Sequence, residues 1–115
     1  FRDEIAHGAG LSVLFPAWAE HEMPYDYPRF AQFANRVLGV EMDFEHPERT
    51  AREGIRTLRR FFEEIGMPTQ LSQRGIKPEN YEKPAANTVR TVNGPVKSYS
   101  PLDEKAIVEI YRLAE

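Results

Sequence analysis

The first hydrophobic pattern lies near the start of the chain and has the period of a helix. On a helix, one face would carry the positions i, i+4, i+7, i+8 and i+11, which are His7, Leu11, Leu14, Phe15 and Trp18. The pattern predicts a helix from near Ile5 to around His21. Pro16 lies inside it and predicts a bend, because proline removes one backbone hydrogen bond and clashes one turn back.

Two more helices follow from the same kind of spacing. Asp26 is a suitable N-cap for a second helix that ends at Gly39, with inward residues Phe30, Phe33, Ala34, Val37 and Leu38. After a linker over residues 40–46, Pro47 begins a third helix that Gly66 and Pro68 close. Its inward residues are predicted to be Ala51, Ile55, Leu58, Phe62 and Ile65.

The pattern is weaker in the C-terminal part of the chain. Leu71 and Ile76 are predicted to anchor a loop, residues 78–81 to begin a helix, residues 85–92 to form a short helix and residues 93–95 to turn. A last helix is expected to start with Ser100 as N-cap, Pro101 at its first position and Asp103 at its third. Its inward residues would be Ala106, Ile107, Ile110, Tyr111 and Ala114.

No β-alternation or internal repeat competes with these helices. The sequence therefore predicts an all-α fold, a compact array of about four or five helices, in a single helical domain over residues 1–115. A hydrophobic content of 41% in 115 residues supports one core.

Charge and cysteine content exclude several classes of partner. A net charge of -3 gives no general attraction for nucleic acid or an anionic membrane, so neither partner is predicted. The chain has no cysteine and no run of about 18 apolar residues. We expect a cytoplasmic protein without disulfides or a membrane span.

Two side-chain groups have a functional and a structural interpretation. Five arginines on the third helix resemble a phosphate-binding stripe, but i,i+4 pairing favours a solvated, ion-paired face: Arg49 with Glu53, Arg59 with Glu63 and Arg60 with Glu64. The aromatic group is mostly core by its helical spacing, and consists of Trp18, Phe30, Phe33, Phe61 and Phe62. Phe15 and Trp18 are the better candidates for a substrate pocket, because they follow His7 on its own face.

His7 is the candidate metal ligand. A lone histidine on an apolar face is more often a core residue bonded to a carbonyl. Gly8 and Gly10 each lower helix stability by up to about 1 kcal/mol relative to alanine, which favours a close backbone approach or a ligand beside His7. His21 would lie about 21 Å away along a continuous helix, too far to share an ion. The residue pattern alone predicts no self-contained metal site.

Three stretches resemble one family in its own order. Residues 6–18 resemble the His-Gly helix of the iron-containing alcohol dehydrogenases, particularly the butanol dehydrogenase branch. Residues 61–72 resemble the family's later helix-Gly-x-Pro-x-x-Leu segment, and residues 100–111 resemble its closing helix. The His-Gly motif is the specific part of this resemblance, which spans nearly the whole chain.

The resemblance implies a fragment of a two-domain enzyme. Family members hold their metal with one aspartate and three histidines, and only the last histidine maps here, as His7. The parent would use Fe²⁺, or Zn²⁺ in some cases, and NAD(P)H to interconvert short-chain primary alcohols such as butanol with their aldehydes. The nucleotide-binding domain would lie upstream of Phe1, and no Gly-x-Gly-x-x-Gly motif occurs here. The fragment alone would be metal-free and inactive.

The alternative hypothesis is a self-standing helical interaction module in which His7 is structural. A fragment lacking its upstream helices should expose the apolar face around Leu11, Leu14 and Trp18. We therefore expect a homo-oligomer or a rearranged first helix.

Overall fold

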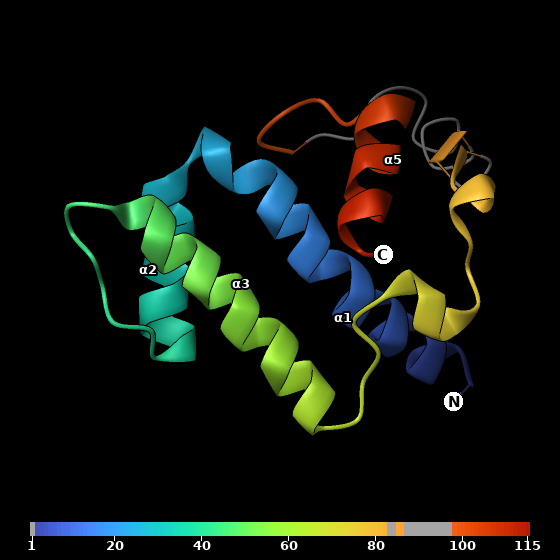
Figure 1. The fold of residues 1–115 in the computed structure, drawn as a ribbon, viewed down its shortest axis with the longest axis horizontal. Helices are drawn as coiled ribbons and strands as arrows, with labels where there is room; N and C mark the ends of the chain where they lie inside the picture. The colour runs from blue at the N-terminus through green and yellow to red at the C-terminus, as the bar shows by residue number, and fades with distance from the viewer. Residues whose placement is uncertain (1, 83–84, 87–97) are drawn as a thin grey trace.

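Helices form the regular structure of the chain. The computed structural model describes the backbone of residues 2–82, 85–86 and 98–115, with side chains from Gly10 onward in these ranges. It contains α1 (Arg2–Glu22), α2 (Tyr27–Leu38), α3 (Pro47–Glu64) and α5 (Glu104–Leu113), with short 3-10 helices η1 (Met23–Tyr25), η2 (Leu71–Arg74) and η3 (Pro78–Asn80) (Figure 1). No strand occurs in these ranges, so the all-α prediction is confirmed.

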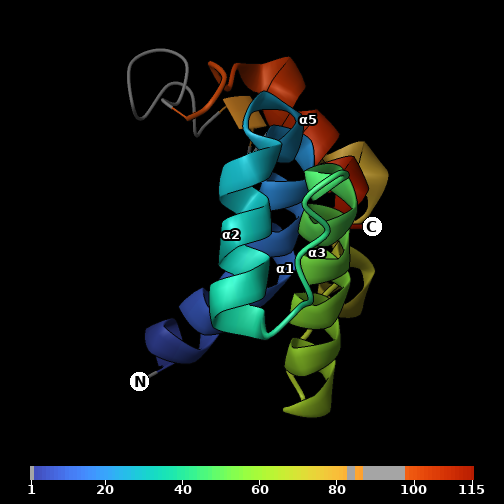
Figure 2. The same ribbon diagram turned by 90° about the vertical axis from the view of Figure 1, so that its left-hand side faces the viewer.

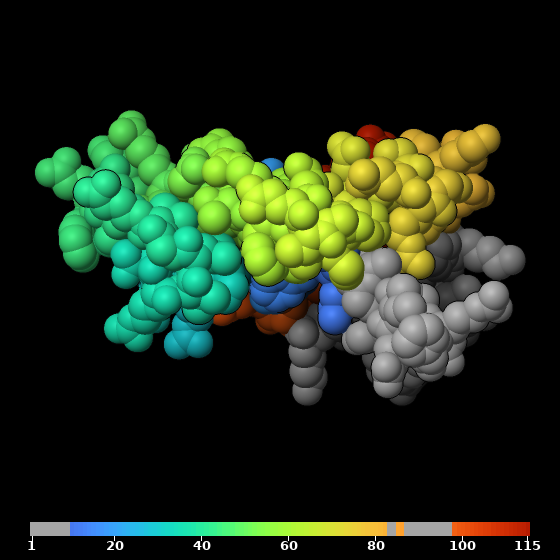
Figure 3. Space-filling view, turned by 90° about the horizontal axis from the view of Figure 1, so that it is seen from below, coloured from blue at the N-terminus to red at the C-terminus, as the bar shows by residue number. Residues whose placement is uncertain are grey.

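Helix α1 lies between two groups of elements. The α2–α3 pair packs on one side of it, and α5 with the segment around η2 and η3 lies on the other (Figures 1 and 2). Each side has its own hydrophobic cluster. The first includes Met23, Phe30 and Ile55, and the second includes Val13, Tyr81 and Ile110. Viewed from below, α3 occupies the centre of the face, between α2 and the η2 segment (Figure 3).

The first helix is longer than predicted and runs without interruption past Pro16. Its predicted apolar face is covered only in part: Leu11 is 50% exposed and Phe15 is 38% exposed, while Leu14 and Trp18 are half-buried. The fully buried face carries smaller residues instead: Ser12, Val13, Pro16, Ala17 and Ala19. The hydrophobic period identified the helix, but neighbouring helices pack against its small residues, which allow closer approach.

The α2–α3 pair is joined through a seam of small residues. Ala31, Ala34, Ala51 and Gly54 are buried there, and a Cβ atom at position 54 would overlap the Ala34 side chain. The predicted ends of α2 are confirmed, because the Asp26 side chain accepts from the Arg29 N–H and Gly39 adopts a left-handed conformation.

Several larger side chains predicted to be inward are not. Val37 is 65% exposed and Ile65 is 57% exposed, while Phe33, Leu38 and Phe62 are half-buried. The seam of small residues explains this, because the helices meet along a narrow line and the apolar positions beside it remain open. The predictions for Phe30, Ala34, Ala51, Ile55 and Leu58 are confirmed.

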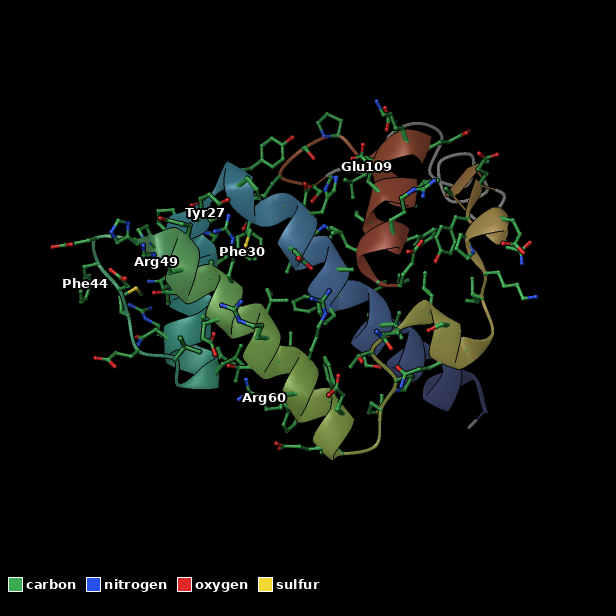
Figure 4. The ribbon with its side chains drawn as sticks, viewed as in Figure 1. Tyr27, Phe30, Phe44, Arg49, Arg60 and Glu109 are labelled. Atoms are coloured by element: carbon green, nitrogen blue, oxygen red, sulfur yellow. The ribbon has the colours of Figure 1, made fainter. Side chains whose placement is uncertain are left out.

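The loop between α2 and α3 is held by the Asp43 side chain. Its carboxylate accepts hydrogen bonds from the backbone N–H groups of Glu45 and His46 at 3.1 and 3.0 Å, and its own N–H donates to the Thr50 hydroxyl at 2.8 Å. This arrangement leaves Phe44 pointing away from the helices (Figure 4), with 90% of its surface exposed.

At the C-terminal end, the predicted N-cap is wrong. Asp103 caps α5, because its carboxylate accepts from the Ala106 N–H at 2.8 Å. Ser100 does not cap the helix, because α5 begins only at Glu104. The Ser100 N–H and hydroxyl both donate to Glu22 instead. The inward positions of α5 are confirmed: Ile107, Ile110 and Ala114 are buried, and Ala106 and Tyr111 pack against them. The predicted helix over residues 85–92 falls mostly outside the described residues, and the turn over 93–95 falls wholly outside them.

Candidate functional site

His7 lies in the N-terminal half of α1, three residues before Gly10. Only its backbone belongs to the described part of the chain, so the structure does not test its ligand role. Within the described residues, no three His, Cys, Asp or Glu side chains gather as a metal site would require. The described side chains therefore do not form a complete metal site.

The other histidines have carboxylate partners. His21 lies between two of them: Nδ1 is 3.1 Å from Oε2 of Glu22, and Nε2 is 3.0 Å from Oε2 of Glu109. Glu109 belongs to α5 (Figure 4), so the imidazole links the end of α1 to the C-terminal helix. His46 contacts Glu48 at 3.4 Å. These contacts give both histidines structural roles.

Glu22 is a buried carboxylate that the sequence analysis did not single out. Its side chain has no exposed surface, and it accepts from the Ser100 N–H at 3.0 Å and the Ser100 hydroxyl at 2.8 Å. Burial alone would raise the pKa of Glu22. Hydrogen bonds from Ser98, Ser100 and His21 favour the ionised form more strongly, so the net effect is a lowered pKa. No local signal could have identified the pair, since its members are 78 residues apart.

Trp18 joins the same C-terminal segment to α1. Its indole Nε1–H donates to the Ser98 hydroxyl at 3.0 Å. Its ring lies 5.9 Å from the Phe30 ring and 6.2 Å from the Tyr99 ring, measured between centroids. Phe15 completes the group, with its ring centroid 5.7 Å from that of Trp18. We define these four residues as the aromatic cluster. Its mutual contacts favour the core interpretation of Trp18 over the substrate-pocket interpretation.

A cavity of about 110 Å³ lies beside α1, next to Gly10. Its walls come from α1, η2, α5 and the segment between η2 and Tyr81, and the side chains that line it are Val13, Leu14, Leu71, Arg74, Ile76, Tyr81 and Tyr111. The rings of Tyr81 and Tyr111 meet edge to face at 5.6 Å. Burial, and next the Glu115 carboxylate, raise the pKa of Tyr81. The sequence did not predict this cavity, although Gly8 and Gly10 had favoured a close backbone approach or a ligand beside His7.

The arginines of α3 form ion pairs, but with other partners than predicted. Arg56 binds Glu53 at 2.9 Å, and Arg59 binds Glu20 of α1 at 3.0 Å. Glu63 instead accepts from the Thr69 hydroxyl at 3.1 Å, so the predicted pair with Arg59 is wrong. The predicted pairs of Arg49 with Glu53 and Arg60 with Glu64 do not form among the described residues, where Arg60 lies 4.0 Å from Glu53. Mixed charge along this helix favours the solvated face over a phosphate-binding stripe.

Comparison with known proteins decides the family. Residues 3–114 match the family described as the Fe-containing alcohol dehydrogenase family, C-terminal. The chain belongs to this family. The predicted resemblance is therefore confirmed, and the His-Gly motif at His7 and Gly8 lies inside the matched range.

Family relatives include two bacterial proteins. The chain is 31% identical over 110 residues to NADH-dependent butanol dehydrogenase A of Clostridium acetobutylicum. It is 30% identical over 109 residues to the probable NADH-dependent butanol dehydrogenase 1 of Bacillus subtilis. Each match covers 95% of this chain and 28% of the relative, so the chain spans less than a third of the length of these relatives.

A solved family structure supports the fold. The crystal structure of NADH-dependent butanol dehydrogenase A from Thermotoga maritima superimposes with a TM-score of 0.83 at 27% identity. The match covers 96% of this chain and 29% of that chain. The arrangement of α1, the α2–α3 pair and α5 is thus the fold of the corresponding part of that enzyme. Among the described residues, none of the helices has both the length and the apolarity needed to cross a bilayer.

Proposed function

We propose that this chain is the metal-bearing helical part of a cytoplasmic NAD(P)H-dependent alcohol dehydrogenase. The enzyme interconverts short-chain primary alcohols, such as butanol, with their aldehydes. The observation that carries the proposal is the family match over residues 3–114, which includes His7 and Gly8. Both relatives are named as NADH-dependent butanol dehydrogenases, one of them as probable, which supports the substrate class and the cofactor.

In this proposal the chain contributes one metal ligand, His7, and the remaining ligands come from outside residues 1–115. The metal is Fe²⁺ or Zn²⁺, and when bound it polarises the alcohol or aldehyde oxygen as a Lewis acid. The nicotinamide cofactor is bound chiefly by an N-terminal nucleotide-binding domain, because this chain has no glycine-rich phosphate-binding motif. The 115 residues alone hold neither metal nor activity.

The described side chains support the helix that carries His7. The Ser12 hydroxyl donates to the Pro68 carbonyl at 2.5 Å, Trp18 donates to Ser98, and the buried Glu22 binds Ser100. These bonds connect α1 to segments far along the chain. A helix fixed at several points holds a ligand in a defined position, which a metal site requires.

The test measures bound metal and NAD(P)-dependent alcohol oxidation in the enzyme that contains this chain with its nucleotide-binding domain. His7→Ala should lose most of its bound iron or zinc and its activity, because one metal–imidazole bond is removed. His46→Ala is the matched control, since His46 is not a proposed metal ligand and its imidazole contacts Glu48 of α3, and it should keep both metal and activity. The 115-residue chain should be inert. Undiminished metal and activity in His7→Ala would return His7 to a structural role and contradict the proposal.

A further inference from the structure

The cavity beside Gly10 has the features of a ligand site that the proposed function does not use. Four aliphatic side chains form part of its wall: Val13, Leu14, Leu71 and Ile76. Gly10 contributes no side chain, which leaves space against the α1 backbone. An engineered apolar cavity of about 150 Å³ stays dry and binds benzene, so a cavity of about 110 Å³ fits a somewhat smaller aliphatic group.

Among the described residues that line this cavity, Arg74 is charged. Arg74 is the last residue of η2, and its guanidinium lies over Gly10, with Nη1 at 3.5 Å from the position a Cβ atom would take there. The Arg74 side chain is exposed and forms no hydrogen bond or ion pair with the described residues. No carboxylate is among the described lining residues. A cation with no partner among the described residues, at the rim of an apolar cavity, complements an anion that carries a short aliphatic tail.

The tyrosines complete the wall without competing for the anion. Tyr81 is almost fully buried and its hydroxyl is engaged by Glu115. The edge-to-face contact of Tyr81 with Tyr111 fixes both rings as apolar surface. Arg74 is therefore the group in this wall that can recognise a carboxylate through paired N–H donors.

We propose that this cavity binds a short-chain aliphatic carboxylate of about four carbons, with the carboxylate on Arg74 and the alkyl chain between Leu14, Leu71 and Ile76. None of the described lining residues is a proposed metal ligand, although Gly10 follows His7 by one turn of α1. Short-chain carboxylates are the oxidised relatives of the proposed aldehydes.

The experiment is a calorimetric titration of the metal-stripped enzyme with sodium butyrate. Removing the metal with a chelator excludes the metal as the binding group and separates this test from that of the proposed function. For so small a ligand we expect a Kd on the order of 1 mM. Affinity should rise about fourfold per methylene from acetate to butyrate, and hexanoate should gain nothing more, because the cavity is then full.

Two variants and a control make the test decisive. Arg74→Gln removes the charge from an exposed side chain and should weaken butyrate binding about tenfold or more. Gly10→Leu fills the cavity from the α1 side and should abolish binding while circular dichroism stays helical. Arg36→Gln is the control, because Arg36 is an exposed arginine of α2 that lines a separate depression with Phe44. This variant should bind butyrate with the same affinity as the unmodified protein.

The outcomes separate the site from its alternatives. Butyrate binding that is lost in Arg74→Gln and Gly10→Leu and kept in Arg36→Gln supports the proposal. Equal butyrate affinity of Arg74→Gln and the unmodified protein would overturn the proposal. A titration that shows no heat of butyrate binding would also overturn it. Binding of 1-butanol as tight as that of butyrate would show a general apolar cavity and overturn the carboxylate assignment.

Discussion

Glu22 ends α1 with a carboxylate that has no exposed surface, and its partners come from the far end of the sequence. The Ser100 N–H and hydroxyl both donate to it, and His21 links it to Glu109 of α5. A buried carboxylate is costly unless its oxygens are satisfied, and here hydrogen bonds satisfy them. The same contacts that stabilise the ion attach the segment before α5 to the first helix.

The free energy of unfolding should therefore decrease in acid, because Glu22 becomes protonated. Its pKa is lowered in the folded protein, so the unfolded chain binds the proton more readily. The stabilisation is fully present above the unfolded pKa, near the ordinary value of 4.5, and is lost as pH falls through the lowered folded pKa. Urea unfolding between pH 7 and pH 3 should show a steeper loss in the unmodified chain than in Glu22→Gln, which cannot ionise.

Glu22→Ala should cost about 3 kcal/mol at pH 7, because the Ser100 donors are left buried without an acceptor. Glu45→Gln on the exposed loop is the control for an ordinary carboxylate. If Glu22→Gln followed the same pH curve as the unmodified chain, the charge of Glu22 would not contribute to stability.

The α2–α3 pair depends on a close approach at Gly54. A Cβ atom there would overlap the Ala34 side chain, so the helices would have to separate. Gly54→Ala should destabilise the chain by about 1–3 kcal/mol by overpacking, more than the gain in helix propensity of up to about 1 kcal/mol. Gly10→Ala is the matched control, since its Cβ would make only an ordinary 3.5 Å contact, and it should be neutral or stabilising. Equal stability of both variants in urea would show that the seam tolerates a methyl group.

The elements also show which features of the fold can be predicted from the sequence. Asp26, Gly39 and Pro47 mark helix ends correctly, because caps act on groups within one turn. Ser100 failed as a cap because α5 begins only at Glu104, behind Asp103, and the Ser100 hydroxyl is directed to Glu22, 78 residues away. Val37 and Ile65 were wrongly placed inward because periodicity reports a whole apolar stripe, while the partner helix covers only its centre.

The candidate site was less predictable than the helices. His7 was found through the His-Gly resemblance, and the family match confirms the resemblance but not the ligand role. The long-range group around Glu22, and the cavity with Arg74, depend on segments that meet only after folding. A single sequence carries no local signal for such contacts.

At the scale of the whole molecule, apolar surface remains open. The radius of gyration is 14.8 Å, above the roughly 13 Å typical of a domain of this length. The buried hydrophobic residues of the described part of the chain form two clusters rather than one. Leu11 and Phe15 lie on the exposed side of α1. The ring of Phe15 also packs against that of Phe33, with 6.4 Å between the ring centroids. Contiguous apolar surface of this kind favours association.

We expect the 115-residue chain to self-associate through this side of α1, with an average mass in sedimentation equilibrium that rises with concentration. Leu11→Glu should shift the chain toward monomer without unfolding it, because half of the Leu11 side chain already faces solvent. Phe44→Glu is the control, since it removes a more exposed apolar side chain at the tip of the α2–α3 loop, away from α1 (Figure 4). A monomer at every concentration would contradict the expectation. A shift caused by Phe44→Glu but not by Leu11→Glu would place the contact on the loop, and α1 would then not be the associating surface.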